Sequence, residues 1–188
     1  MIKAIITDFD GTLVDTFEAN LRAYQKAFNT EGLNLTAEKY RQCFGLRFER
    51  FMTAVAVDDE IVAMRIKEAK MNFYPEFFEY LVPNRSLLEL IGSFHTMGGK
   101  TAIASTARKE NLMNVVRYLD IAGLFDLIYS AKDVKQGKPS PEIYIKTMAT
   151  LGVRPEETLI FEDSEVGIEA AKASGGHYLV VTPEDFNR

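Results

Sequence analysis

A buried strand that runs directly into two acidic residues is the feature of this sequence that most constrains its fold. Residues 2–7 are mostly apolar, as in a strand covered on both faces, and Asp8 and Asp10 follow at once. Residues two apart in an extended chain point to the same side, so both carboxylates can share one face. Gly11 then permits a sharp turn. Two like charges this close are unfavourable unless a cation lies between them or one of them is protonated. The pattern therefore predicts a functional site at the end of this strand, although Asp-Gly is also a common dipeptide in solvated turns.

Beyond residue 83 the sequence alternates between helical and strand patterns. Apolar runs predict strands at residues 101–105, 127–130, 158–161 and 178–181. Between them, helical spacing predicts helices at residues 86–97, 109–118, 141–151 and 164–174. This alternation is typical of parallel strands joined by right-handed crossovers, so we expect an α/β fold with a doubly wound, Rossmann-like parallel sheet.

Residues 16–80 show a different pattern. Helical spacing and helix-start signals predict four helices, at residues 16–29, 36–44, 48–55 and 60–73. No convincing strand occurs among them. We therefore expect an α/β core domain from residues 1–15 and 81–188, with an inserted α-helical domain at residues 16–80.

Several polar groups follow the predicted strands, where ligands bind in sheets of this kind. Asp8 and Asp10 follow the first strand, Ser105 ends the second, and Glu162 and Asp163 follow a later one. Carboxylates converging with hydroxyls favour a hard cation with oxygen ligands, namely Mg²⁺. The only two histidines of the sequence lie far apart, which argues against a zinc site.

The loop Gly-Lys-Pro-Ser-Pro at residues 137–141 is the second candidate feature. Its prolines predict a stiff loop around Lys138 rather than a helix face. An ammonium held beside carboxylates offsets their repulsion and can also bind a phosphate oxygen. Ser105 has two interpretations, as a cap of the following helix or as part of a phosphate seat at the start of that helix.

Four motifs, in order along the chain, resemble those of the haloacid dehalogenase superfamily and of its β-phosphoglucomutase-like subfamily. They are D-F-D-G-T-L-V-D at 8–15, I-A-S-T at 103–106, G-K-P-S-P at 137–141 and F-E-D-S-E-V-G-I-E-A-A-K-A-S-G at 161–175. The resemblance spans the predicted core almost end to end. It implies a Mg²⁺-dependent phosphatase, or a related phosphomutase, with the helical insert as a cap that excludes water and selects the substrate.

The resemblance also implies roles for individual acids. Asp8 would attack phosphorus and form an aspartyl-phosphate, while Asp10 would act as general acid and then general base. Mg²⁺ would bind the Asp8 carboxylate, the backbone carbonyl of Asp10 and Asp163, with Glu162 close by or ligating.

Phosphate binding is implied for a second set of residues. Ser105 and Lys138 would hold the transferring phosphoryl oxygens, and the backbone N–H groups of Phe9 and Thr106 would add to that cradle. In the cap, Arg47 and Arg50 are candidates for a second anion or sugar contact, and a solvated helix face explains them equally well.

Two features of the sequence favour different reactions. Mutase members usually carry a histidine soon after the first motif, and the nearest residue here is Asn20, which favours a phosphatase. The pair Glu162-Asp163 leans towards the mutase-like branch. A non-enzymatic phospho-acceptor module of the receiver type is a third alternative, but such a module needs neither Asp10 nor a cap.

Composition and charge limit the classes of molecule that we expect this chain to bind. A formal charge of −5 and the lack of a basic stretch argue against nucleic acid, and no apolar run is long enough to cross a membrane. The single cysteine, Cys43, cannot form an internal disulfide, which favours a reducing cytoplasm. We expect a small phosphorylated metabolite, such as a sugar phosphate, as the substrate, and a monomer or weak homodimer. The physiological substrate and the cap residues that contact it do not follow from the sequence.

Overall fold

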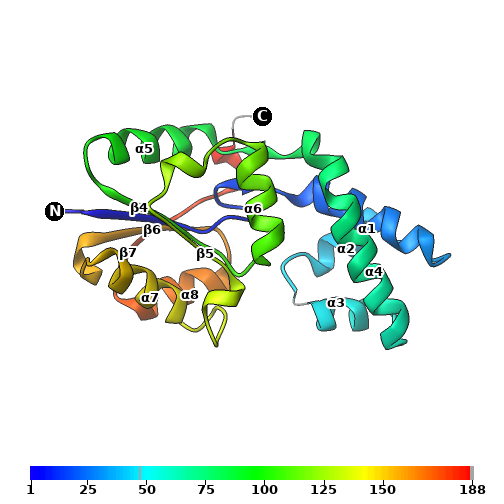
Figure 1. The fold of residues 1–188 in the computed structure, drawn as a ribbon. Coiled ribbons are helices and arrows are strands. Elements are labelled where there is room, and N and C mark those ends of the chain that lie inside the picture. Colours follow the sequence, from blue (N-terminus) through cyan, green and yellow to red (C-terminus); the bar gives the residue numbers. More distant parts are fainter. Residues whose placement is uncertain (47, 187–188) are drawn as a thin grey trace. The chain divides into compact units, whose positions relative to one another are not determined.

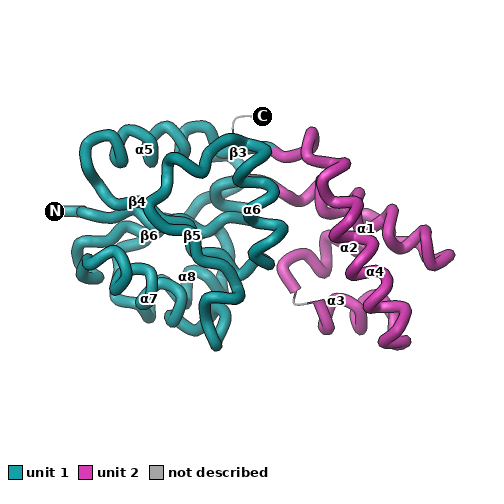
Figure 2. Tube along the Cα trace, viewed as in Figure 1, with its two compact units in different colours: residues 1–15, 82–188 teal, residues 16–81 magenta. Residues whose placement is uncertain are grey.

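In the computed structural model, which describes residues 1–46 and 48–186, the chain forms two units (Figures 1 and 2). An α/β unit comprises Met1–Asp15 and Val82–Arg188, and a helical unit comprises Thr16–Leu81. The helical unit is thus inserted into the α/β unit after residue 15.

A five-stranded sheet forms the centre of the α/β unit. Its strand order is β5-β4-β1-β6-β7, and every neighbouring pair is parallel. The strands are β1 (Ala4–Thr7), β4 (Lys100–Ala104), β5 (Leu127–Tyr129), β6 (Thr158–Glu162) and β7 (His177–Val180). The first strand lies in the middle, and the chain adds strands first on one side of it and then on the other. The predicted doubly wound parallel sheet is confirmed.

Helices cover both faces of this sheet. Helix α5 (Arg85–Thr96) lies on one face, and α7 (Glu142–Leu151) and α8 (Glu165–Ser174) lie on the other (Figure 1). Helix α6 (Lys109–Tyr118) joins β4 to β5 and has the predicted bounds. The core on the α7 and α8 side includes the fully buried Ile6 and Ile160, which belong to the two neighbouring strands β1 and β6.

The strand register brings the predicted site residues to one level. Thr7 of β1 is paired with Ile103 of β4 on one side and with Phe161 of β6 on the other. Residues that directly follow these three positions therefore lie side by side at the carboxyl edge of the sheet. Asp8 and Glu162 are two of them.

The helical unit begins with α1 (Phe17–Thr30), α2 (Ala37–Cys43), α3 (Phe48–Ala54) and α4 (Glu60–Phe73). A 3₁₀ segment, η1 (Tyr74–Tyr80), ends it. The helix starts agree with the capping signals in the sequence: Thr36 Oγ1 accepts a hydrogen bond from Lys39 N at 3.1 Å, and the Asp59 carboxylate accepts two at the start of α4.

Aromatic side chains form the centre of the helical unit. Tyr24, Tyr40 and Phe51 contact one another with ring centroids 4.9–5.7 Å apart. Ile66 is fully buried against this cluster, and Cys43 is also buried in it. Burial of these large apolar surfaces accounts for the stability of a unit that has no strand among its described residues, 16–46 and 48–81.

The sequence did not predict a short antiparallel pair, β2 (Val14–Asp15) with β3 (Val82–Pro83). Both strands belong to the α/β unit, at the two points where the chain leaves for the insert and returns from it. Two residues are too few to show a strand period. Short 3₁₀ turns were also missed: η2 (Ala122–Leu124), η3 (Ala131–Asp133), η4 (Pro155–Glu157) and η5 (Pro183–Asp185). Within residues 1–46 and 48–186, every helix is too short or too polar to cross a membrane.

Candidate active site

The acidic residues of the first and last motifs meet at the carboxyl edge of the sheet. Asp8 follows β1, and its backbone N–H donates to the carbonyl of Phe161 at 3.0 Å. Glu162 is the last residue of β6 and is fully buried. In each strand the acid lies two residues after a buried isoleucine, Ile6 or Ile160, so it points to the α7 and α8 side of the sheet.

Lys138 joins these two acids. Its ammonium lies 2.5 Å from Asp8 Oδ1 and also donates to Glu162 Oε1, and its side chain is only 4% exposed. The loop that carries Lys138 is fixed by Glu142 at the start of α7, whose carboxylate accepts hydrogen bonds from Lys135 N at 2.8 Å and Gln136 N at 2.7 Å. The lysine is therefore held by its surroundings and is not a surface side chain that happens to lie near acids.

Asp163 is held by residues of the first motif. Thr12 Oγ1 donates to Asp163 Oδ1 at 2.7 Å. Gly11 has a φ of +88° and lies against the same carboxylate, so a Cβ at this position would lie 2.2 Å from Asp163 Oδ2. The glycine is thus required both by the backbone turn and by the close approach of the acid.

The carboxylates of Asp8, Glu162 and Asp163 form a group that could hold a metal ion. One oxygen from each lies within 4.8 Å of the others. With Lys138, the four ionised groups carry a net charge of −2, which a divalent cation balances. An all-oxygen set of hard ligands fits Mg²⁺.

The pKa directions agree with an acid-rich, buried site. Burial raises the pKa of Asp8 well above its ordinary value, opposed by the Lys138 charge and reinforced by Glu162. Burial also raises the pKa of Asp163, opposed by its hydrogen bond from Thr12. For Lys138, burial alone would lower the pKa, but the charges of Asp8 and Glu162 outweigh it and raise the pKa, so the lysine stays protonated.

The remaining predicted residues of the α/β unit lie on the same edge. Asp10 lies in the tight turn after β1, which is closed by a hydrogen bond from Gly11 N to Val14 O at 2.8 Å. Phe9 is buried in the same turn. Ser105 and Thr106 directly follow β4, with the serine buried and the threonine exposed.

Ser105 does not cap a helix. Its Oγ accepts a hydrogen bond from Ala107 N at 3.0 Å, whereas α6 begins only at Lys109 and is preceded by Arg108. The capping interpretation is therefore wrong, and the role of the Ser105 hydroxyl in a phosphate seat stays a prediction. The two cap candidates belong to the helical unit: Arg50 is exposed on α3, and Arg47 lies outside the described residues.

Sequence reasoning missed three residues around the acids. They are Thr12, which holds Asp163; Tyr144, whose hydroxyl donates to Glu162 Oε1 at 2.6 Å; and Gly167, where a Cβ would lie 2.0 Å from the Glu162 carboxylate. A signal for Tyr144 existed, because a tyrosine on the buried face of a predicted helix needs a partner for its hydroxyl.

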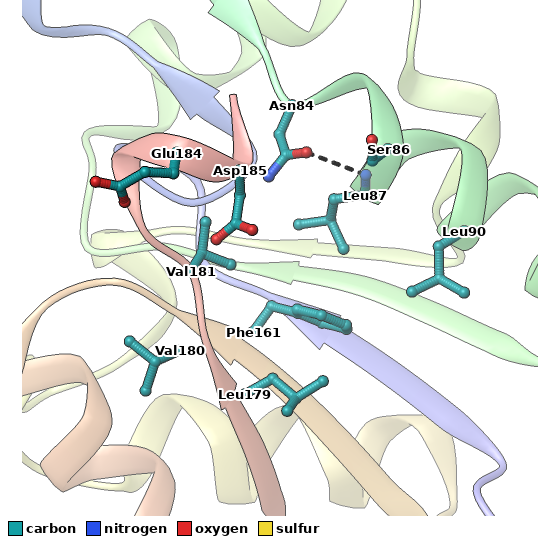
Figure 3. Close-up of a pocket in the computed structure, with 10 residues that line it drawn as sticks. All are labelled: Asn84, Ser86, Leu87, Leu90, Phe161, Leu179, Val180, Val181, Glu184 and Asp185. Carbon is teal, nitrogen blue, oxygen red and sulfur yellow. Dashed lines mark hydrogen bonds between the residues drawn. The ribbon is translucent and has the colours of Figure 1, made fainter. Parts of the chain in front are cut away.

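A pocket of about 430 Å³ lies elsewhere on the α/β unit, between α5, β7 and the turn η5 (Figure 3). Apolar side chains such as Leu90, Phe161 and Leu179 line it, with Glu184 and Asp185 at its rim. The acids at positions 8, 162 and 163 are not among its lining residues. The acidic group of the candidate active site therefore does not line this pocket.

Comparisons with known proteins identify the family of this chain. The family model described as haloacid dehalogenase-like hydrolase matches residues 5–181. A phosphorylated carbohydrates phosphatase from Thermotoga maritima is 31% identical over 180 residues, covering 93% of this chain and 82% of the relative.

Solved structures give the same result. A variant of CbbY from Rhodobacter sphaeroides, in complex with xylulose-(1,5)bisphosphate, has a TM-score of 0.83 and 26% identity, covering 100% of this chain and 89% of that one. A β-phosphoglucomutase from Clostridium difficile has a TM-score of 0.78 and 25% identity, covering 99% and 87%.

The chain belongs to the haloacid dehalogenase-like hydrolases, as the family model and the fold show. It is an enzyme of this family, whose relatives include phosphatases and phosphoglucomutases.

Proposed function

We propose that this protein is a Mg²⁺-dependent phosphoric monoester hydrolase that acts on a small phosphorylated metabolite through an aspartyl-phosphate on Asp8. The observation that carries the proposal is the buried contact of Asp8 with Lys138, 2.5 Å apart, beside two further carboxylates. A carboxylate held this way can act as a nucleophile, while the ammonium and a metal ion neutralise an incoming phosphate.

Two displacements make up the reaction. An oxygen of Asp8 attacks phosphorus, the bond from phosphorus to the leaving oxygen breaks, and Asp10 gives its proton to that oxygen. Asp10 then takes a proton from water as the water oxygen attacks the aspartyl-phosphate. Inorganic phosphate leaves, and the Asp8 carboxylate is restored.

Other residues of the chain position the phosphoryl group. Lys138 and the Ser105 hydroxyl bind its oxygens, and the backbone N–H groups of Phe9 and Thr106 add to the same seat. Asp8, Asp163 and the backbone carbonyl of Asp10 would hold Mg²⁺, with Glu162 beside them. When bound, the ion neutralises the negative charge of the transferring group.

The substrate is best described by class. The relatives include a phosphatase of phosphorylated carbohydrates and a protein whose structure holds a sugar bisphosphate. We therefore propose a sugar phosphate or a similar small metabolite, with the helical unit as the cap that selects it and Arg47 and Arg50 as candidate contacts. The single buried cysteine agrees with action in a reducing cytoplasm.

A sugar phosphomutase is the second candidate, favoured by the likeness to a β-phosphoglucomutase. Asn20 favours the hydrolase. Its amide donates to Thr16 O at 3.0 Å and to Tyr74 Oη at 3.4 Å, and an amide cannot exchange a proton as the histidine common in mutases can. We therefore rank hydrolysis first.

The decisive experiment is hydrolysis of p-nitrophenyl phosphate with and without Mg²⁺, by the wild type and by Asp8→Asn. We expect turnover that requires the metal and that falls by at least ~10³-fold in the variant, because the nucleophile is removed. Asp120→Asn is the matched control, since Asp120 is exposed and has a positive φ that asparagine tolerates. Full activity in Asp8→Asn would contradict the proposal.

A substrate panel separates the two reactions. Hexose and pentose phosphates and phosphoglycolate should release inorganic phosphate at different rates. Isomerisation of a hexose 1-phosphate that depends on a bisphosphate primer would instead establish the mutase.

A further inference from the structure

Tyr144 contacts the acidic group and has no role in the reaction described so far. It is on the inner face of α7 and is fully buried. Its hydroxyl donates to Glu162 Oε1 at 2.6 Å, and the Lys138 ammonium lies 5.0 Å from the centre of its ring. Both its polar and its aromatic part therefore contact the groups that hold Asp8.

Glu162 is surrounded by donors from the chain. Oε1 accepts hydrogen bonds from Tyr144 and Lys138. Oε2 accepts them from Asp163 N at 3.1 Å, Ser164 N at 3.4 Å and Ser164 Oγ at 3.3 Å. A carboxylate offers about four lone-pair positions, and five donors reach this one. Glu162 is therefore suited to be a fixed internal anion that orients its neighbours.

Space around Glu162 is equally restricted. Gly167 of α8 lies so close that a Cβ there would be 2.0 Å from the carboxylate. The glutamate is confined between α8 and the Tyr144 hydroxyl, and the Lys138 ammonium is held between this glutamate and Asp8. A shift of Glu162 Oε1 would carry the ammonium with it.

We propose that Tyr144 is a positioning residue for Lys138: through Glu162, its hydroxyl fixes the ammonium against Asp8. The inference rests on the proposed function, in which Lys138 binds the transferring phosphoryl group. A purely structural role is the alternative, since Tyr144 also belongs to the core beside Ile6 and Ile160. Phenylalanine would fill that core equally well but would lack the hydroxyl.

The first test is a double-mutant cycle with Tyr144→Phe, Glu162→Gln and the combined variant, assayed on p-nitrophenyl phosphate. We expect Tyr144→Phe to lower kcat about tenfold, as loss of one hydrogen bond to a charged group predicts, with KM and the Mg²⁺ concentration for half activity changed less than about twofold. In the Glu162→Gln background, Tyr144→Phe should have no further effect, because the link is already broken.

Tyr129→Phe is the matched control. Tyr129 is also a tyrosine of the α/β unit whose hydroxyl has one side-chain partner, Thr150 Oγ1 at 2.9 Å, outside the site. It should keep wild-type kinetics. Effects of Tyr144→Phe that are additive with Glu162→Gln, or a loss of thermal stability without a change in kcat, would overturn the inference.

The second test does not depend on activity or on folding of the Glu162 variant. In metal-free protein labelled with ¹⁵N-lysine, the Lys138 ammonium signal is identified by its loss in Lys138→Met. We expect Tyr144→Phe to shift this signal and to speed its hydrogen exchange, and Tyr129→Phe to leave it unchanged.

The two tests separate the two proposals. If the wild type does not hydrolyse phosphate esters but the lysine signal moves in Tyr144→Phe, the proposed function is wrong and the link from Tyr144 to Lys138 stands. If the wild type is active and Tyr144→Phe matches it in kinetics and in the lysine signal, the link is wrong and the proposed function stands.

Discussion

The α/β unit and the helical unit use buried polar groups in different ways. In the α/β unit, three carboxylates gather at one edge of the sheet, and the Lys138 ammonium forms ion pairs with two of them, Asp8 and Glu162. In the helical unit, ion pairs such as Arg22–Glu18 and Arg65–Glu31 lie at the surface, and the interior is aromatic and aliphatic. Its one described buried lysine, Lys70, lies 4.0 Å from the centre of the Tyr74 ring.

This difference explains which functional residues can be recognised from the sequence. Buried charges are costly unless each is paired, so the acidic residues of the α/β unit need particular neighbours at particular positions and leave recognisable motifs. Aromatic packing tolerates many sequences of similar volume. The residues proposed to carry the chemistry can therefore be recognised in the sequence of the α/β unit, whereas the sequence of the helical unit contains no comparable motif.

Two glycines make the comparison testable, and among the tests that compare the two units they give the largest expected effect. Gly11 in the α/β unit and Gly32 in the helical unit both have a positive φ, of +88° and +70°. Alanine at either position costs about 1–2 kcal/mol of backbone strain. Only Gly11 faces a side chain, the Asp163 carboxylate, whereas nothing lies within 4 Å of a Cβ at Gly32.

We therefore expect Gly11→Ala to lower kcat/KM about 100-fold, because a displaced acid misplaces the reacting groups. Gly32→Ala should lower thermal stability to a similar or smaller extent and keep activity within about twofold. Equal activities of the two variants would show that the position of Asp163 does not matter.

The pH dependence of the metal-free protein gives an intermediate effect. Because burial and the neighbouring acids raise the pKa of Asp8, the folded state holds this proton more tightly than the unfolded state does. Stability from this group is therefore present at low pH and is lost as pH rises from about 4 through the raised pKa. A one-unit difference in pKa corresponds to about 1.4 kcal/mol.

The measurement is Tm in EDTA between about pH 5 and pH 8. Asp8→Asn should gain stability over the wild type near pH 8 and lose this advantage towards pH 5, and Mg²⁺ should restore the wild type at pH 8. Glu157 contributes stability with the opposite pH dependence, because hydrogen bonds from Arg154 and Lys3 lower its pKa to about 2. This contribution changes only below about pH 4.5, outside the measured range. A wild-type Tm that rises from about pH 5 to about pH 8 would contradict the predicted loss of stability with rising pH.

The smallest effect concerns the interior of the helical unit. Ile66 is fully buried there. Ile66→Val should reduce the free energy of unfolding by about 0.5–1.5 kcal/mol, measured by urea denaturation, through the loss of one buried methylene. Hydrolysis of p-nitrophenyl phosphate at a temperature where the protein is folded should not change. A large loss of activity would mean that the two units are coupled more strongly than their separate cores suggest.

Much of the α/β unit was predictable because its determinants are local. The helical period defined α6 to the residue, and three of the four motifs lie at strand ends whose level is set by the register of a parallel sheet. The remaining motif, at residues 137–141, instead precedes α7. Such positions follow from the sequence once the strands are recognised.

The contacts that complete the site were not predictable in this way. Thr12 and Asp163 are 151 positions apart, and Tyr144 and Glu162 are 18 apart, so their pairing depends on how helices and strands pack. The pair β2 and β3 was missed for a related reason, since two-residue strands are defined only by their partner. Side-chain hydrogen bonds between elements leave no period in a sequence.

The location of the only cysteine offers a way to follow one unit without the other. Cys43 is buried in the aromatic interior of the helical unit, and the α/β unit contains no thiol at all. A thiol reagent added to the native protein can therefore react only when that interior opens, and its rate counts those openings. The natural sequence thus already carries a reporter for local opening of the helical unit, and no engineered cysteine is needed.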